Sequence, residues 1–271
     1  MIERERETIS PLSRARNFLL TISILSSIII LFLLVPLIFL MLVAGLEGVL
    51  EATKSREALF SIFLSMEAGA VAATISTIFG IPLAYLLSRT SFPGRSILEG
   101  LLDLPLVMPH TVAGIAILLA FSSRAPLGPF FTSLGLRVED SLWGTIMAMS
   151  YVSAPFAVNF ARQGFESIDI SLEQVARSLG SSQFRVFFTV SLPLAIRSII
   201  TGWLMAMARA VSEVGAIMIV AYHPIVGSVL VYEWFTTRGL VAAASLSVLL
   251  LAASLMILVG LRILKWKGWA T

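Results

Sequence analysis

Long apolar runs separated by short polar segments dominate the pattern of this chain. A helix needs about 20 mostly apolar residues to cross the hydrocarbon core of a bilayer. Glu67 in the second run, and Arg209 and Glu213 in the fifth, weaken those two assignments without removing them. The chain is therefore predicted to be an all-α integral membrane protein with six transmembrane helices, at roughly 18–44, 58–88, 102–122, 142–162, 198–222 and 239–263.

Composition supports the bilayer as the solvent of this chain. Hydrophobic residues make up 58% of its 271 residues and charged residues 13%, whereas a soluble domain averages about 45–50% and about 25%. The formal net charge is +3, but the basic residues fall between the apolar runs and form no single patch, which argues against nucleic acid as a partner. The sequence has no cysteine, and His110 and His223 are its two histidines, so it predicts no disulfide and no metal site.

Arginine and lysine residues indicate the orientation of the spans. With the N-terminus inside, thirteen of them lie on inner segments and five on outer segments, and this excess places both termini in the cytoplasm. The first apolar run is too long for the core of a signal peptide, so we predict that it is retained as a span. The predicted organisation is a cytoplasmic segment 1–17, a six-helix transmembrane domain 18–263 with a long inner loop at about 163–197, and a cytoplasmic tail 264–271.

The inner loop contains the stretch LEQVARSLGSSQFRVFFTVSLPLA, Leu172 to Ala195, which has the pattern of short soluble helices. Ser171 and Gln174 fit a capping box, and Gly180 is a natural helix stop. A second short helix is predicted from about 182 to 190, before Pro193. The first helix is either a surface helix on lipid headgroups or a docking helix for a soluble partner. Its apolar stripe is Leu172, Val175, Ala176 and Leu179, and its predicted polar face is Glu173, Gln174, Arg177 and Ser178.

The same stretch resembles the cytoplasmic loop of ABC importer membrane subunits, whose pattern is E-A-A-x3-G-x9-I-x-L-P. Gln replaces the leading Glu and Val replaces the first Ala, while the spacing is met by Gln174-Val175-Ala176, Gly180, Val190, Leu192 and Pro193. Further segments look like the molybdate, tungstate and sulfate permease subgroup, and are most similar to molybdate/tungstate subunits, particularly archaeal ones. They are GIPLAYLLSRTSFPGR (80–95), LLDLPLVMPHTVAGIAILLAF (101–121) and ARAVSEVGAIMIVAYHP (208–224), within a resemblance that covers about residues 80–246.

This resemblance implies one half of a permease dimer in the cytoplasmic membrane, which moves a tetrahedral oxyanion inward by alternating access. A second copy of the chain, two separate ATPase subunits and an external oxyanion-binding protein are the implied partners. The chain itself is expected to bind no cofactor, since ATP and magnesium belong to the ATPase subunits and the sequence has no G-x4-G-K-[ST] phosphate loop. The residues implied in coupling to the ATPase are Glu173, Gln174, Val175, Ala176, Arg177, Gly180 and Pro193.

Charged residues at bilayer depth cost on the order of 2.5–3.5 kcal/mol each on insertion scales, so they face protein or water. Arg209 and Glu213 are four residues apart, and they form either a structural ion pair or part of a translocation pathway for an anion. Arg before Glu is the less favourable order, which indicates a further partner. Near Thr111, Pro109 would kink or break the third span, either for packing or to aim N–H groups at an anion. His110 is interpreted as an interfacial or packed histidine.

One other protein class and one other substrate fit parts of the sequence, and a third class does not. An ion-coupled secondary transporter would need intramembrane carboxylates, for which Glu67 and Glu213 are candidates, but it leaves the docking-loop pattern unexplained. An intramembrane enzyme finds no support, because no paired Asp, Ser/Lys or HExxH arrangement occurs. Within ABC permeases the alternative substrate is sulfate or thiosulfate, and the choice of anion belongs to the binding protein.

Overall fold

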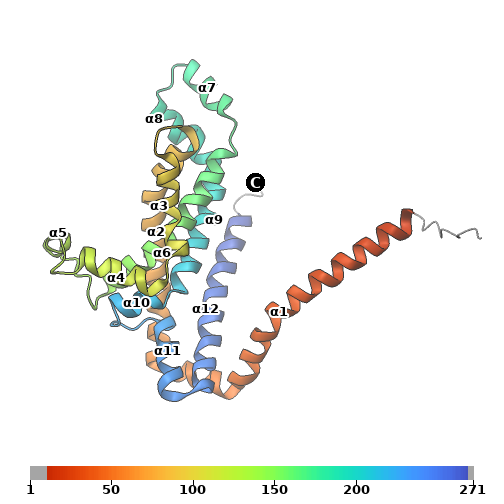
Figure 1. The fold of residues 1–271 in the computed structure, drawn as a ribbon, viewed down its shortest axis with the longest axis vertical. Coiled ribbons are helices and arrows are strands. Elements are labelled where there is room, and N and C mark those ends of the chain that lie inside the picture. Colours follow the sequence, from red (N-terminus) through yellow and green to blue (C-terminus); the bar gives the residue numbers. More distant parts are fainter. Residues whose placement is uncertain (1–10, 268–271) are drawn as a thin grey trace, which may run out of the picture.

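The structure, a computed structural model, describes residues 11–267. Within this part of the chain every regular element is a helix, and most of the long helices stand side by side in a bundle from which the first helix diverges (Figure 1). The predicted terminal segments 1–17 and 264–271 lie partly outside the described residues.

Three long helices form the centre of the bundle. They are α2 (Arg56–Arg89), α6 (Leu142–Glu166) and α9 (Leu192–Val211), and each packs against the other two. Small side chains allow helix backbones to approach closely in a membrane. Such residues are buried on these helices: Ala68, Gly69, Ala72 and Ala73 on α2, and Ala206 and Ala210 on α9.

The first helix, α1 (Pro11–Lys54), packs against the bundle only near its C-terminal end. It bends at Gly45, whose φ of +62° is non-helical. After the bend it lies against α12 (Leu240–Lys267), next to α11 (Gly227–Arg238). Before the bend, nearly every side chain from residue 18 to 43 is exposed, and the helix runs away from the bundle (Figure 1).

The predicted third span, 102–122, is two helices with a sharp bend between them. α3 (Arg95–Val107) is followed by α4 (His110–Phe121), and their axes differ by 117°. Pro109 lies at the break, where its ring and its missing N–H prevent the helix from continuing. α4 and the short α5 (Gly128–Ser133) extend sideways from the bundle (Figure 1).

The predicted fifth span, 198–222, is wrong at both ends. α9 begins earlier than predicted and ends at Val211, and a turn separates it from α10 (Gly215–Val220), which packs against α4. The physical reason is Glu213, whose carboxylate accepts a hydrogen bond from the backbone N–H of Ala216 at 2.8 Å. A side chain that bonds the backbone locally in this way competes with the helical ladder.

Three helices in the described part of the chain are long and apolar enough to cross a bilayer, or four if the bent pair α3–α4 counts as one span. A further apolar helix, Leu240–Met256, is shorter. The all-α prediction with several apolar helices is therefore confirmed, whereas the number of six spans stays a prediction. The three helices are Phe18–Lys54, Arg56–Arg89 and Gln183–Val211.

The close approach of α6 and α9 generates a prediction about Gly202. A Cβ at this position would lie 2.8 Å from the Cβ of Phe160 and 3.1 Å from the carbonyl oxygen of Ala157, neither of which can move freely. We expect Gly202→Ala to lower the free energy of unfolding by about 1–3 kcal/mol, measured by thermal unfolding in detergent. Gly100→Ala is the control, because a Cβ there meets nothing within 4 Å. Equal stability of the two variants would contradict the packing argument.

Candidate functional site

The helix α7 (Ile170–Ser178) confirms the predicted short helix of the inner loop, but its cap differs. Asp169, not Ser171, is the N-cap, and its carboxylate accepts a hydrogen bond from the Ser171 N–H at 2.9 Å. This backbone hydrogen bond lowers the pKa of Asp169. At the other end Gly180 has a φ of +89°, and the N–H groups of Gly180 and Ser181 bond the carbonyls of Arg177 and Ala176. This Schellman motif requires a left-handed residue, which glycine supplies at no steric cost.

The buried and exposed residues of α7 differ from the predicted apolar and polar faces. The apolar residues Leu172, Val175 and Leu179 are 49%, 58% and 82% exposed, so the bundle does not cover the stripe. Glu173, which was predicted on the polar face with Gln174, is buried instead. The remaining predicted polar residues Gln174, Arg177 and Ser178 are exposed, and they line an open hollow of about 660 Å³ together with Gly180, Ser181, Ser182 and Gln183.

After α8 (Gln183–Val186) the chain enters a π-helical segment, η1 (Phe187–Ser191), that runs into α9 without a break. The Leu192 N–H donates to the carbonyl of Phe187, five residues back. The next residue, Pro193, has no N–H for the helical ladder, so the ladder shifts at this point. The predicted second short helix was therefore correct in place, but Pro193 lies inside a longer helical run rather than after its end. The sequence analysis missed the π-helix.

Glu173 is held by side chains from two other elements. Its Oε1 accepts a hydrogen bond from Arg89 Nε of α2 at 2.9 Å and one from Ser191 Oγ of η1 at 2.8 Å. Its Oε2 accepts a hydrogen bond from Tyr85 OH at 3.2 Å. The side chains of Arg89 and Glu173 are only 9% and 10% exposed. We call Glu173, Arg89, Tyr85 and Ser191 the Glu173 cluster.

A second cluster lies where the two broken helices meet. Arg209 Nη2 is 2.9 Å from Glu213 Oε2, and His110 Nδ1 is 2.7 Å from the same oxygen. The side chain of Glu213 is 1% exposed, that of Arg209 20% and that of His110 50%. Arg209 Nη2 also lies 2.9 Å from His110 Nδ1, which accepts from Arg209 when neutral at that atom and donates to Glu213 when protonated. This corner cluster confirms the predicted ion pair and supplies the further partner.

The other two predicted pathway residues lie beside this corner. Pro109 is the N-cap of α4 and Thr111 belongs to its first turn, so they flank His110 and both are exposed. Gly215 makes the approach of α4 possible, because a Cβ on it would lie 2.8 Å from the Cβ of His110. The fold therefore brings the four predicted residues together. The sequence analysis missed His110 as the residue that links them, although its place directly after Pro109 was a usable signal.

Glu67 on α2 does not join either cluster. Its side chain is exposed, and within the described residues it has no hydrogen bond or ion pair. The predicted pairing of Glu67 with another helix is therefore not found in this part of the chain.

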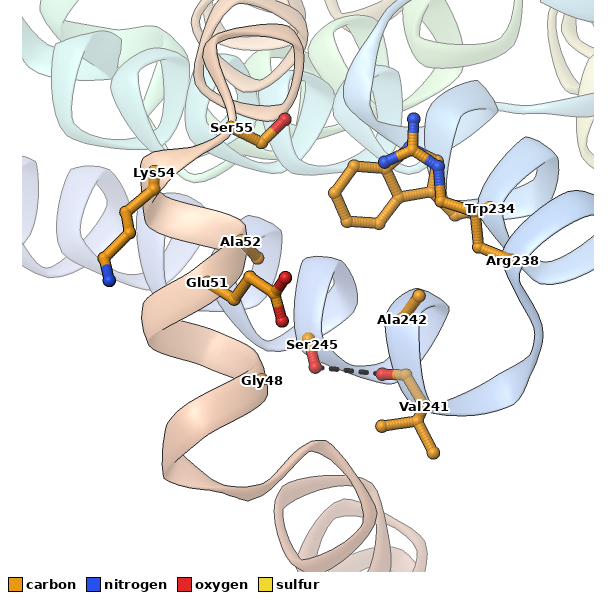
Figure 2. A pocket seen from close by; sticks show the side chains of 10 residues that line it. All are labelled: Gly48, Glu51, Ala52, Lys54, Ser55, Trp234, Arg238, Val241, Ala242 and Ser245. Carbon is orange, nitrogen blue, oxygen red and sulfur yellow. Dashed lines mark hydrogen bonds between the residues drawn. The ribbon is translucent and has the colours of Figure 1, made fainter.

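A cavity of about 550 Å³ lies at the opposite end of the bundle from α7, between the α1–α2 and α11–α12 turns (Figure 2). Arg238 stacks over the Trp234 ring at 4.3 Å and pairs with Glu57 at 2.9 Å. Glu51 and Lys54 of α1 also line the cavity. Both signs of charge are present on its wall, so the cavity has no clear preference for an anion or a cation.

The fold thus combines apolar helices that are long enough to cross a bilayer, a buried ion pair where two bent helices meet, and a loop of short helices at one end. The chain belongs to the family of binding-protein-dependent transport system inner membrane components, whose pattern matches residues 76–262. It is a multi-pass membrane protein of the cell membrane.

Among characterised relatives, the molybdate/tungstate transport system permease protein WtpB of Pyrococcus abyssi is 48% identical over 196 residues, which is 72% of this chain and 74% of the relative. WtpB of Thermococcus kodakarensis is 40% identical over 244 residues, covering 89% and 92% of the two chains. The molybdenum transport system permease protein ModB of Escherichia coli K12 is 38% identical over 157 residues, covering 58% and 69%.

The fold is also that of a solved transporter. A bacterial ABC transporter involved in the import of the acidic polysaccharide alginate superposes with a TM-score of 0.73, over 99% of this chain and 100% of the other, at 17% identity. At this identity the likeness shows the shared fold alone.

The corner cluster generates a prediction about stability. Arg209→Met would leave the buried Glu213 carboxylate without its guanidinium, and breaking a buried pair costs about 3–5 kcal/mol. We expect the double variant Arg209→Met/Glu213→Leu to lose less than the sum of the two single losses, measured by unfolding of the purified proteins. The exposed pair Arg238–Glu57 is the control, for which a coupling near zero is expected. Additive losses at Arg209 and Glu213 would refute the pairing.

Proposed function

We propose that this chain is the membrane subunit of an ATP-driven importer that carries molybdate or tungstate into the cell by alternating access. The observation that carries this proposal is the 48% identity to a molybdate/tungstate transport system permease protein. A protein named "probable sulfate transport system permease protein cysT", from Chlorokybus atmophyticus, is 32% identical over 198 residues. The order of these identities favours molybdate and tungstate over sulfate, which has the same charge and tetrahedral shape.

The proposed ATPase partner docks on α7 and α8. Their exposed apolar side chains form a surface that fits the helix-in-groove mode of recognition. Gln174 and Arg177 supply polar contacts at its edge, and Gly180 sets the turn between the two helices. The apolar surface consists of Leu172, Val175, Leu179 and Phe184, with exposures from 49% to 82%. The position of α7 beyond the end of the bundle (Figure 1) supports docking to a soluble partner over a helix resting on lipid headgroups.

A second copy of the chain is the proposed partner within the membrane. The exposed part of α1 is apolar all round, and it needs lipid or protein as its surroundings. A dimer would cover part of this arm and would enclose a pathway between the two subunits. With α7 on the ATPase side, the excess of arginine and lysine on inner segments supports a cytoplasmic location of both termini. An external oxyanion-binding protein would dock at the opposite end.

We assign the corner cluster to the anion pathway. Arg209 and His110 keep exposed surface toward the outside of the subunit, beside Pro109 and Thr111, while Glu213 lies behind them. A guanidinium with a partly open side can attract an oxyanion while its buried carboxylate fixes its position. A purely structural pair would leave transport intact in the Arg209→Met/Glu213→Leu double variant. The pathway role predicts that this variant folds and supports ATP hydrolysis but transports poorly.

The function is tested by reconstituting the chain in vesicles with its ATPase subunit and its binding protein. We expect binding protein loaded with molybdate or tungstate to stimulate both ATP hydrolysis and uptake of the anion. Sulfate-loaded binding protein and the unloaded protein are the controls. Equal stimulation by sulfate-loaded binding protein would contradict the assignment of molybdate or tungstate as the substrate. Uptake driven by an ion gradient without ATP would refute the ABC class and favour a secondary transporter.

Coupling through the inner loop is tested at Gly180. Gly180→Val forces a β-branched side chain into a left-handed backbone, which distorts the turn after α7. We expect the variant to hydrolyse ATP with the transport rate reduced about 5- to 30-fold, the effect of a distortion worth roughly 1–2 kcal/mol. Gly94→Val is a matched control, because Gly94 has the same φ of +89° and the same open space but lies outside the loop. Normal transport by Gly180→Val would contradict the docking assignment.

A further inference from the structure

Glu173 is the buried residue of a helix that is otherwise exposed. The residues of α7 on either side of it, Leu172 and Gln174, are exposed, and Glu173 is the one buried residue of α7, next to a half-buried Ala176. A force applied to the exposed surface of α7 therefore reaches the rest of the chain through the Glu173 side chain and through the two ends of the helix.

The Glu173 carboxylate connects α7 to two separate routes into the membrane. One route is α2, which provides Arg89 and Tyr85. The other is η1, which provides Ser191 and continues as α9. Arg89 also reaches the carbonyl of Ile168, just before α7, at 3.4 Å.

Aromatic packing also holds α2 and η1 together beside the Glu173 cluster. The Tyr85 ring lies edge-on to the Phe187 ring at 4.8 Å and to the Phe165 ring at 5.3 Å, so α2, η1 and the end of α6 meet around one side chain. The far end of α9 carries Arg209, which belongs to the corner cluster. One continuous helix thus joins the Glu173 cluster to the corner cluster.

A buried ion pair is a poor device for stability alone. Well-packed apolar side chains of similar volume are often as stabilising, because both ions must be taken out of water. What the pair adds is fixed geometry, since the carboxylate accepts three hydrogen bonds from defined directions. That property suits a group that must move together with its partners.

We propose that the Glu173 cluster transmits the movement of α7 to α2 and, through η1, to α9 and the corner cluster. Glu173 is then a positioning residue within this chain, and it makes no direct contact with the ATPase. This inference rests on the proposed function, because it requires an ATPase partner that moves α7.

The test compares Glu173→Gln, Arg89→Gln and Ser191→Ala in the complete importer. We expect all three to co-purify with the ATPase and to keep its basal hydrolysis rate. The number of anions transported per ATP should fall at least about tenfold in the first two, the equilibrium effect of losing one charged hydrogen bond, and less in the third. Glu166→Gln is the matched control, because Glu166 pairs with Arg162 at 2.7 Å in a more exposed position at the same end of the bundle.

The outcomes separate this inference from the proposed function. If wild-type importer shows no anion-stimulated hydrolysis, the proposed function fails. If wild type is coupled and Glu173→Gln loses its ATPase while Arg89→Gln keeps it, Glu173 contacts the ATPase directly and the inference is wrong. Normal transport per ATP in both variants would also overturn it. Should either variant fail to assemble, Arg89→Lys and Ser191→Ala carry the test, and unchanged coupling in both would refute the inference.

Discussion

A carboxylate that leaves water must receive its hydrogen bonds and its counter-charge from the chain itself. Glu213 sets this requirement at the centre of the fold. One of its oxygens is satisfied by the start of α10, and the other by Arg209 and His110. The end of α9, the start of α10 and the start of α4 must therefore all be at one place, which is why the break at Pro109 and the break after Val211 meet.

The same requirement applies at the other end of α9. There Glu173 is satisfied by Arg89, Tyr85 and Ser191, again from separate elements. With 20 residues, α9 is about 30 Å long, close to the thickness of the hydrocarbon core. A buried carboxylate thus lies at each end of α9. Each carboxylate fixes the relative positions of the helices that donate hydrogen bonds to it.

Local signals in the sequence predicted the all-helical fold and the short helices of the inner loop, but they missed the π-helix and the end of α9 at Val211. The break at Pro109 and the stop at Gly180 follow from the backbone chemistry of single residues. The burial of Glu173 did not follow, because it depends on Arg89, which is 84 residues away and was counted only as an inner charge. Periodicity placed Glu173 on the polar face, but a long-range ion pair reversed its direction. His110 was misjudged for the same reason, since its partners lie 99 and 103 residues further along the chain.

The bend at Gly45 also has a consequence for the order in which the protein is made. The apolar part of α1 before the bend contacts almost nothing else in its own chain, so it can enter the bilayer as an independent helix while the ribosome is still translating later spans. At the bend α1 reaches α12, where Ser245 Oγ donates to the carbonyl of Ala44 at 3.3 Å, and the part after the bend packs on α12 and α2. The position of α1 in the subunit therefore depends on a contact 201 residues further along the chain, and it cannot be fixed before α12 has been synthesised.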